Sequence, residues 1–391
     1  MTLRLRPVVR AFATSALFLA AWGVLHVGFY HREYPQEAGE DVVLYDSYGD
    51  AVKDGQVPYR DFAVVYPPGA LPAFLVPAPA ADYARAFEIT MLVCGLAMAF
   101  LVGLATSSLP GLLLVGLSPP LVGDLMQTRY DLWPALLTTG AMVALLRDRH
   151  RLGWAVLATA VVAKGYTICL VPLAVLWTGR RAGRAELARA AAWGAGVAAV
   201  LVLPFLALSP GGLWQSVHDQ LVRPLQIESL GAAILMQMHR ATIEFTYGSH
   251  NVAGHPASLL ATGSTVVVLA ALLWVWWRFS RDRADAAGFC AAAAAVVCAY
   301  VAFGKVLSPQ YLIWLVPLVA LVPGRRGLAA AVLLAVACAL TLWWTPTRYG
   351  SYKNEFRWAW VVLGRDLVLV ALFATLAWPA MRLRAAVRSR P

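Results

Sequence analysis

Long apolar runs recur along almost the whole chain, and they constrain the fold more than any other feature of the sequence. Each run spans about 15–20 residues, close to the length that a helix needs to cross the hydrocarbon core of a bilayer. Apolar residues make up 60% of the 391 and charged residues 14%, against about 45–50% and about 25% in soluble domains. A soluble protein with a large core would not repeat runs of this length. The sequence therefore predicts an all-α polytopic membrane protein.

The runs predict one membrane-embedded domain over residues 1–391, with about 12 transmembrane helices. We expect them near residues 11–30, 83–107, 109–123, 130–146, 152–165, 167–178, 189–208, 257–277, 286–304, 308–322, 327–344 and 358–380. The run that contains Pro119-Pro120 and the two runs that meet at Lys164-Gly165 are short for a full crossing, so we expect some half-helices inside the protein. The first run is too long for a typical signal peptide, which favours a retained first span.

The basic residues form short clusters at the ends of apolar runs, so the net charge of +11 does not indicate nucleic-acid binding. One alternation of spans places every cluster on the cytoplasmic side, together with roughly 19 of the 32 Lys and Arg residues and about four of the 21 acidic ones. It predicts a multi-pass protein of the plasma membrane with both termini in the cytoplasm. The clusters lie around Arg4–Arg10, Arg147–Arg151, Arg180–Arg189, Arg278–Arg283, Arg325–Arg326 and Arg382–Arg390.

Two long loops fall on the opposite, extracytoplasmic side, at residues 31–82 and 209–257. In the first, residues 41–54 resemble a surface helix that begins with an acidic first turn and ends before Gly55, with Val42, Leu44, Tyr45 and Tyr48 toward lipid or protein. Asp41 would lie where the first span leaves the bilayer. A solvated acidic loop is the alternative interpretation for these carboxylates.

Several polar residues lie at the outer ends of spans, where an unpaired charge is costly and a functional role is the first hypothesis. Arg129 and Asp131 are two residues apart. They either form an ion pair that anchors the helix end, or Arg129 binds an anionic ligand while Asp131 orients it. Lys164 and Lys305 lie at breaks between apolar runs, with snorkelling to the interface as the alternative. In the second long loop, Gln226 and Glu228 follow Arg223; a loop of this length is often functional, with an unstructured linker as the alternative.

The sequence has no P-loop, no Gly-rich dinucleotide motif, no serine-hydrolase motif and no zinc-ligand spacing. The five cysteines lie in or beside apolar runs and contain no Cys-x-x-Cys pair, so we expect them to be small core residues. Nucleotide-binding chemistry is unsupported, and chemistry on sugars or lipids is favoured.

Taken in order, these motifs resemble the GT-C superfamily of membrane glycosyltransferases. The order is a first span, Asp41 with Tyr45, Gly-Gln-Val-Pro-Tyr at 55–59, Tyr-Pro-Pro-Gly at 66–69, Arg-Tyr-Asp at 129–131, Lys164, Gln-Ile-Glu-Ser at 226–229 and Lys-Val-Leu-Ser-Pro-Gln-Tyr-Leu-Ile-Trp at 305–314. The closest likeness is to glycosyltransferase family 87, the polyprenol-phosphate-mannose-dependent α-mannosyltransferases of actinobacteria. It covers residues 10–380.

The resemblance implies a GT-C-type bundle that transfers a sugar, in the first place mannose, from a polyprenyl-phosphate donor to a hydroxyl of a glycolipid or cell-envelope glycan. It implies an extracytoplasmic active site, inversion at the sugar, and no nucleotide or metal cofactor. The position that matches the family's catalytic base is Asp41, with Asp46 and Asp61 as competitors. The substrate-binding candidates are Tyr66, Arg129, Asp131, Lys164, Gln226, Glu228, Lys305, Gln310 and Tyr311.

Inverting transfer needs a carboxylate that accepts the acceptor's proton, which an ionised Asp41 supplies. The leaving group is a lipid phosphate, so nearby cations would stabilise the charge that develops on it. A transporter or lipid flippase is the leading alternative, although transporters usually place polar groups at the bilayer midplane. A non-catalytic membrane scaffold is the third hypothesis, and it would tolerate substitution of Asp41, Arg129 and Lys305.

Overall fold

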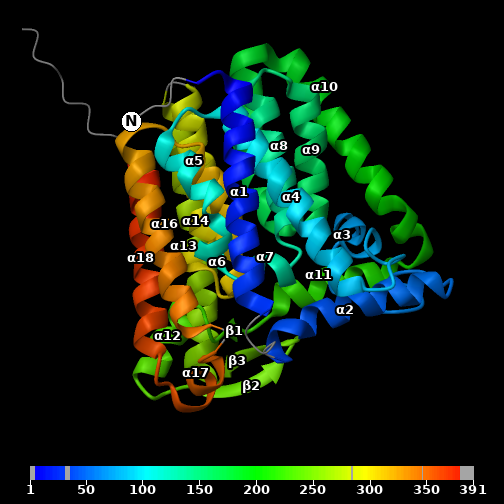
Figure 1. The fold of residues 1–391 in the computed structure, drawn as a ribbon, viewed down its shortest axis with the longest axis vertical. Helices are drawn as coiled ribbons and strands as arrows, with labels where there is room; N and C mark the ends of the chain where they lie inside the picture. The colour runs from blue at the N-terminus through cyan, green and yellow to red at the C-terminus, as the bar shows by residue number, and fades with distance from the viewer. Residues whose placement is uncertain (1–4, 31–35, 283–284, 346, 379–391) are drawn as a thin grey trace, which may run out of the picture.

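The computed structural model describes residues 5–30, 36–282, 285–345 and 347–378, and most of them are helical (Figure 1). Twelve α-helices of nine residues or more lie among the described residues, and the bundle is built from ten of them. These are α1 (Pro7–Tyr30), α4 (Tyr83–Ala105), α8 (Leu132–Leu146), α9 (His150–Ala163), α10 (Val171–Leu208), α13 (His255–Arg281), α14 (Ala286–Phe303), α15 (Leu312–Ala320), α16 (Gly324–Trp344) and α18 (Ala359–Ala377).

Within the described residues, seven stretches are long and apolar enough to cross a membrane, as an all-α membrane protein requires. They are Pro7–Gly28, Tyr83–Ala105, Gly165–Leu208, His255–Arg281, Ala286–Phe303, Gly324–Trp344 and Ala359–Ala377. Three shorter apolar segments, Leu132–Leu146, His150–Ala163 and Pro309–Ala320, pack among them. Each predicted apolar run thus contains helix, while the count of about 12 crossings stays a prediction.

Several runs are broken where the sequence predicts. Pro119 and Pro120 lie in the first turn of α6 (Ser118–Val122), which follows α5 (Leu109–Gly116) and precedes α7 (Leu125–Thr128). The α9 helix stops at Ala163, and after Lys164 the chain continues as a 3₁₀ helix, η2 (Gly165–Leu170). Inside α10, Gly183 has a φ of 81°, so the helix is broken between the two predicted runs.

The predicted surface helix exists but begins earlier than expected. It is α2 (Gln36–Lys53), and Asp41 lies in its second turn, so the prediction that the helix starts at residue 41 is wrong. Its C-terminal end is as predicted, because Gly55 adopts a φ of 79°. Val42, Tyr45 and Tyr48 are buried against the bundle, as the pattern indicated.

The second long loop is more structured than its sequence indicated. Residues 209–257 contain α11 (Pro210–Val222), α12 (Leu230–Gln237) and an antiparallel sheet in the order β1-β3-β2, from β1 (Leu225–Gln226), β2 (Thr242–Thr246) and β3 (Ser249–Ala253). Tyr247 and Gly248 both have positive φ between β2 and β3, as in a two-residue type I′ hairpin. In Figure 1 these elements lie at one end of the bundle with α2 and α17 (Tyr349–Glu355), which we call the polar end.

The polar end also holds three short segments: η1 (Pro68–Ala70), α3 (Leu71–Leu75) and η3 (Pro309–Tyr311). The basic clusters meet elsewhere, around the turn between α8 and α9. Arg181 pairs with Asp148, Arg151 pairs with Glu186, and Arg180 donates to the carbonyl of Phe279. Three of the predicted cytoplasmic clusters, around residues 147–151, 180–189 and 278–282, therefore lie together. Arg4, Glu33 and Arg382–Arg390 fall outside the described residues.

Candidate active site

The predicted base, Asp41, is held in an ion pair. Its Oδ2 pairs with Nη1 of Arg129, which directly follows α7, and the two side chains are 30% and 16% exposed. Tyr45, one helical turn further along α2, donates its hydroxyl to the same carboxylate oxygen at 3.5 Å. The helix α2 and the segment after α7 thus present one carboxylate and one guanidinium at the polar end, both still partly open to solvent.

A second, more buried ion pair lies two residues further along the chain. Asp131 is 1% exposed, and its Oδ1 accepts hydrogen bonds from Lys164 Nζ and from Trp314 Nε1, each at 2.6 Å. The ion pair suggested between Arg129 and Asp131 is not formed, because each residue pairs with a different element, while ligand binding by Arg129 stays a prediction. Arg129 reaches α2, whereas Asp131 joins the break after α9 to α15.

Aromatic rings surround the Lys164 ammonium. Nζ lies 4.4 Å from the ring centroid of Tyr130, 5.1 Å from that of Trp314 and 5.6 Å from that of Tyr311. The ring of Trp314 stacks on the rings of Tyr311 and Tyr166, with distances between ring centroids of 3.9 Å and 4.0 Å. Cation–π contacts offset part of the cost of burying an ammonium. The Tyr130 hydroxyl is buried and has no hydrogen-bond partner in the described part of the chain.

The Tyr66-Pro-Pro-Gly69 motif fixes the position of Lys164 from the other side. The Gly69 carbonyl accepts a hydrogen bond from Trp133 Nε1 at 2.9 Å. A Cβ on Gly69 would lie 2.7 Å from the backbone nitrogen of Ala163, the last residue of α9. Only glycine allows so close an approach, so this motif packs directly against the helix end that leads into Lys164.

Tyrosines line the space beside Asp41. The ring of Tyr66 lies 5.9 Å from that of Tyr45 and 4.9 Å from that of Tyr130. Burial raises the pKa values of Tyr45 and Tyr66 well above the usual value for a tyrosine hydroxyl. Both hydroxyls therefore stay protonated and are hydrogen-bonding groups rather than bases, which leaves the carboxylate of Asp41 to accept a proton.

The competing bases lie in different surroundings. The Asp61 carboxylate accepts two hydrogen bonds from Arg60 and one from the backbone of Val57 at the surface, and these lower its pKa to about 2. Asp46 lies on α2, where Asp50 and Lys53 are its charged neighbours, and burial raises its pKa. Neither carboxylate pairs with a predicted substrate-binding cation within the described residues.

Glu228, Gln226 and Lys305 form a neighbouring group. The backbone nitrogen of Gln226 donates to the carbonyl of Lys305 at 2.9 Å. Glu228 accepts from the Tyr349 hydroxyl at 3.1 Å, and burial raises its pKa to about 7. Tyr311 is influenced by both groups, since, besides burial, the charges of Asp131 and Glu228 each raise the pKa of its hydroxyl. Gln310 lies next to it in η3 and is half-buried.

The structure therefore brings Tyr66, Arg129, Asp131, Lys164 and Tyr311 together around Asp41. It places Gln226, Glu228 and Lys305 in the adjoining group, and Gln310 next to Tyr311 in η3. Sequence reasoning missed the network around Glu88, a buried carboxylate of α4 that accepts from Trp22 Nε1 at 3.3 Å and from Gln127 Nε2 at 3.0 Å. It also missed the Arg365–Asp366 pair of α18, both 0% exposed. Adjacent opposite charges inside the run 358–380 were the available signal.

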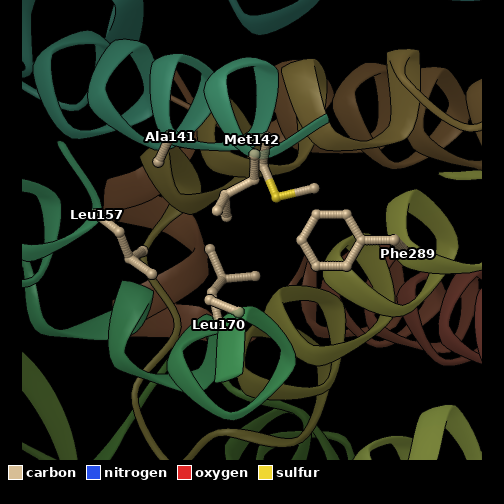
Figure 2. A pocket seen from close by; sticks show the side chains of 7 residues that line it. Ala141, Met142, Leu157, Leu170 and Phe289 are labelled. Atoms are coloured by element: carbon tan, nitrogen blue, oxygen red, sulfur yellow. The ribbon is translucent and has the colours of Figure 1, made fainter. Parts of the chain in front are cut away.

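A small cavity of about 10 Å³ lies away from these groups, among α8, α9, η2, α10 and α14 (Figure 2). Its lining is entirely apolar: Ala141, Met142, Leu145, Leu157, Leu170, Ala174 and Phe289. A binding site needs a few convergent polar groups, so we do not assign it a ligand. Among the described residues, no group of three or more His, Cys, Asp or Glu side chains is placed to hold a metal ion.

No protein-family model and no curated protein matches this sequence.

Proposed function

We propose that the chain is a membrane glycosyltransferase, which transfers a sugar from a polyprenyl-phosphate donor to an acceptor hydroxyl. Mannose is the sugar that we expect. The observation that carries this proposal is the pair of adjoining ion pairs, Asp41 with Arg129 and Asp131 with Lys164. Gathering four charged groups at one place is costly when one of them, Asp131, is fully buried and the others are partly buried. A chain of mostly apolar helices that retains them at its polar end has the arrangement expected of a functional site.

In the proposed reaction Asp41 accepts the proton of the acceptor hydroxyl as its oxygen bonds to C1 of the sugar. The bond from C1 to the phosphate oxygen breaks, the configuration at C1 inverts, and the lipid phosphate leaves with the bonding electrons. Cations near the leaving phosphate stabilise the charge that develops there. The sequence offered Arg129, Lys164 and Lys305 for this role. The rings of Tyr66 and Tyr311 would pack against sugar faces.

We place the reaction on the outer face of the plasma membrane. The support is the separation of charge in the fold. Asp41 lies on α2 at the polar end, whereas Arg151 in α9 and Arg181 in α10 form ion pairs beside the turn between α8 and α9. Basic clusters of this kind normally stay in the cytoplasm. The acceptor would be a glycolipid or a cell-envelope glycan.

The test is a transfer assay with the purified protein in lipid, radiolabelled polyprenyl-phosphate-mannose and a membrane extract. A labelled glycolipid or glycan that forms with the parent protein and not with Asp41→Asn supports the proposal. Absence of any labelled product with several polyprenyl-phosphate sugars, from well-folded protein, would overturn it.

A transporter or lipid flippase is the second candidate, and one observation favours it. Arg365 and Asp366 are buried inside α18, where ionisable residues in transporters often mark the path of a substrate. Movement of a lipid-linked sugar across proteoliposome membranes, without transfer of the sugar, would favour this candidate.

A further inference from the structure

Two cations lie close together at the polar end, outside the ion pairs described above. Arg223 follows the last residue of α11, and Lys305 follows α14. Lys305 Nζ donates to the carbonyl of Leu221 at 2.8 Å, and its own carbonyl accepts from the backbone of Gln226 at 2.9 Å. These two bonds hold Lys305 against the chain on both sides of Arg223.

Neither cation has a carboxylate partner within the described residues, in contrast to Arg129 and Lys164. Arg223 donates to Ser249 Oγ at 2.9 Å and to Gln220 Oε1 at 3.5 Å, both neutral acceptors. Burial and the nearby charge of Arg223 lower the pKa of Lys305, which is the direction expected for two like charges that repel. Such a pair is stabilised when an anion lies between the two cations.

Glu228, an acidic group whose pKa the charge of Arg223 affects, does not supply that anion. Glu228 is within electrostatic range of Arg223, but burial raises its pKa to about 7 and the Tyr349 hydroxyl already donates to it. Its charge is therefore incomplete near neutral pH. Within the described part of the protein, Arg223 therefore donates no hydrogen bond to a carboxylate.

Two buried polar atoms beside this pair also lack partners. The Arg223 Nε donor and the Gln226 Oε1 acceptor are both buried without a hydrogen bond to any described residue. Buried polar groups are paired in the great majority of cases, and exceptions call for an explanation such as a ligand. One unused donor and one unused acceptor match a ligand that combines phosphate oxygens with sugar hydroxyls.

Capping of α11 accounts for only part of this arrangement. The Lys305 ammonium bonds one of the free carbonyls at the C-terminal end of α11, where a positive charge is favourable. That contact uses one of three donors on the ammonium. It explains neither the presence of Arg223 beside it nor the buried atoms without partners.

Tyr311 connects this pair to the rest of the site. Burial and the charge of Asp131 raise the pKa of its hydroxyl, the charge of Arg223 lowers it, and Lys164 Nζ lies 5.6 Å from its ring. We infer that Arg223 and Lys305 bind the phosphate group of the lipid-linked donor, while Arg129 and Lys164 remain paired with carboxylates around the sugar. The identity of the ligand as a sugar donor rests on the proposed function, whereas the anion site does not.

The test is a binding measurement on the full-length protein in nanodiscs with three probes: a short-chain polyprenyl phosphate, the matching neutral polyprenol, and inorganic phosphate. We expect Arg223→Gln and Lys305→Gln each to raise the Kd for polyprenyl phosphate about tenfold or more, as for loss of a charge-assisted hydrogen bond. Arg223→Lys retains the charge and should lose less. Binding of the neutral polyprenol should be weak and unchanged by these variants.

Matched controls come from exposed cations that have their own acidic partners. Arg60→Gln and Lys53→Gln remove side chains paired with Asp61 and Asp50, and they should leave the Kd within about twofold. Competition by inorganic phosphate at millimolar concentration would identify a site for free phosphate. Failure to compete identifies the lipid headgroup as the ligand, because the chain then contributes to binding.

An unchanged affinity for polyprenyl phosphate in well-folded Arg223→Gln and Lys305→Gln would overturn the inference. A larger loss of this affinity in Arg129→Gln than in those two variants would also overturn it. The proposed function fails separately. Polyprenyl phosphate binding that depends on Arg223 and Lys305, in a protein that transfers no sugar, would leave the anion site standing and overturn the transfer reaction. Normal sugar transfer by both variants would support the transfer reaction and overturn the assignment of Arg223 and Lys305 to the donor phosphate.

Discussion

The carboxylate of Asp41, on a helix that follows the first span, forms an ion pair with the guanidinium of Arg129, which follows α7. The pair is only partly buried, so a small acceptor can approach the carboxylate from the exposed side. Asp41 is thus both a stabilising partner and the proposed base. Variants can separate these two roles.

Asp41→Asn should lower the rate of sugar transfer about 10²–10⁴-fold, because an amide of the same shape cannot accept the acceptor's proton. The measurement is transfer of radiolabelled mannose by the purified variant. The matched controls are Asp46→Asn on the same helix and Asp61→Asn in the same loop, which should transfer at close to the parent rate. An active Asp41→Asn variant would remove Asp41 from the mechanism.

The double variant D41R/R129D should restore stability without restoring activity. Arg129→Asp alone places two carboxylates side by side and should lower the thermal unfolding temperature. The double variant re-forms an ion pair with its polarity reversed, and such neighbouring substitutions are not additive. Thermal unfolding in detergent and the transfer assay report the two roles on the same samples. Recovery of transfer in the swapped protein would contradict the assignment of Asp41 as base.

Lys164→Ala should destabilise the protein strongly, by about 3 kcal/mol or more, since it leaves the fully buried Asp131 carboxylate without its cation. Arg151→Ala is the matched control, because it removes a partner of Glu186 from an exposed pair and should cost about 1 kcal/mol or less. Thermal unfolding temperatures of the two variants give the comparison. Equal effects would show that the Asp131–Lys164 pair contributes no more than a surface pair.

Gly69→Ala should reduce both stability and transfer, because its Cβ would lie 2.7 Å from the backbone of Ala163 and push the end of α9 away. Gly165→Ala, on the other side of Lys164, meets no atom within 4 Å and should be tolerated. Expression, unfolding temperature and transfer rate of the two variants test this difference. A silent Gly69→Ala substitution would mean that the Tyr-Pro-Pro-Gly motif does not position Lys164.

The stability of the protein should depend on pH through Glu228. Burial raises the pKa of this carboxyl from its ordinary 4.5 to about 7, so between these values the folded protein keeps a proton that the unfolded chain has lost. The free energy of unfolding therefore falls by about 3 kcal/mol as pH rises through this window, and the contribution of Glu228 is constant above it. Glu228→Gln should flatten the pH dependence of the unfolding temperature in that window. If the unfolding temperature of Glu228→Gln depended on pH as steeply as that of the parent protein, Glu228 would not be the titrating group.

The sequence was informative about which residues lie at the ends of spans. Charged groups in otherwise apolar runs stand out, and Arg129, Asp131, Lys164 and Lys305 were found this way. Their partners were not predictable. Pairing depends on how each helix is rotated about its axis and on the break after Ala163, and both are set by packing among helices distant in sequence.

Two misjudged segments have clear physical causes. The acidic residues of 36–40 gave no apolar period, so the early start of α2 left no signal in its hydrophobic pattern. The hairpin of residues 242–253 did leave a signal in the sequence. Tyr247-Gly248 lies between two runs in which polar and apolar residues are interleaved. Arg223 gained its significance only from the fold, where a bond between Gln226 and Lys305 brings a second cation beside it.

Residues 129–131 join the two ion pairs of the site through a single intervening residue, the buried Tyr130. Asp41 and Lys164 are therefore mechanically linked across two peptide units that cannot stretch. A ligand that moves the backbone at Arg129 would also shift Asp131 against Lys164 and Trp314. For an enzyme with two substrates, such a shared segment would couple the affinities for donor and acceptor, and each substrate would then change the binding of the other by the same factor.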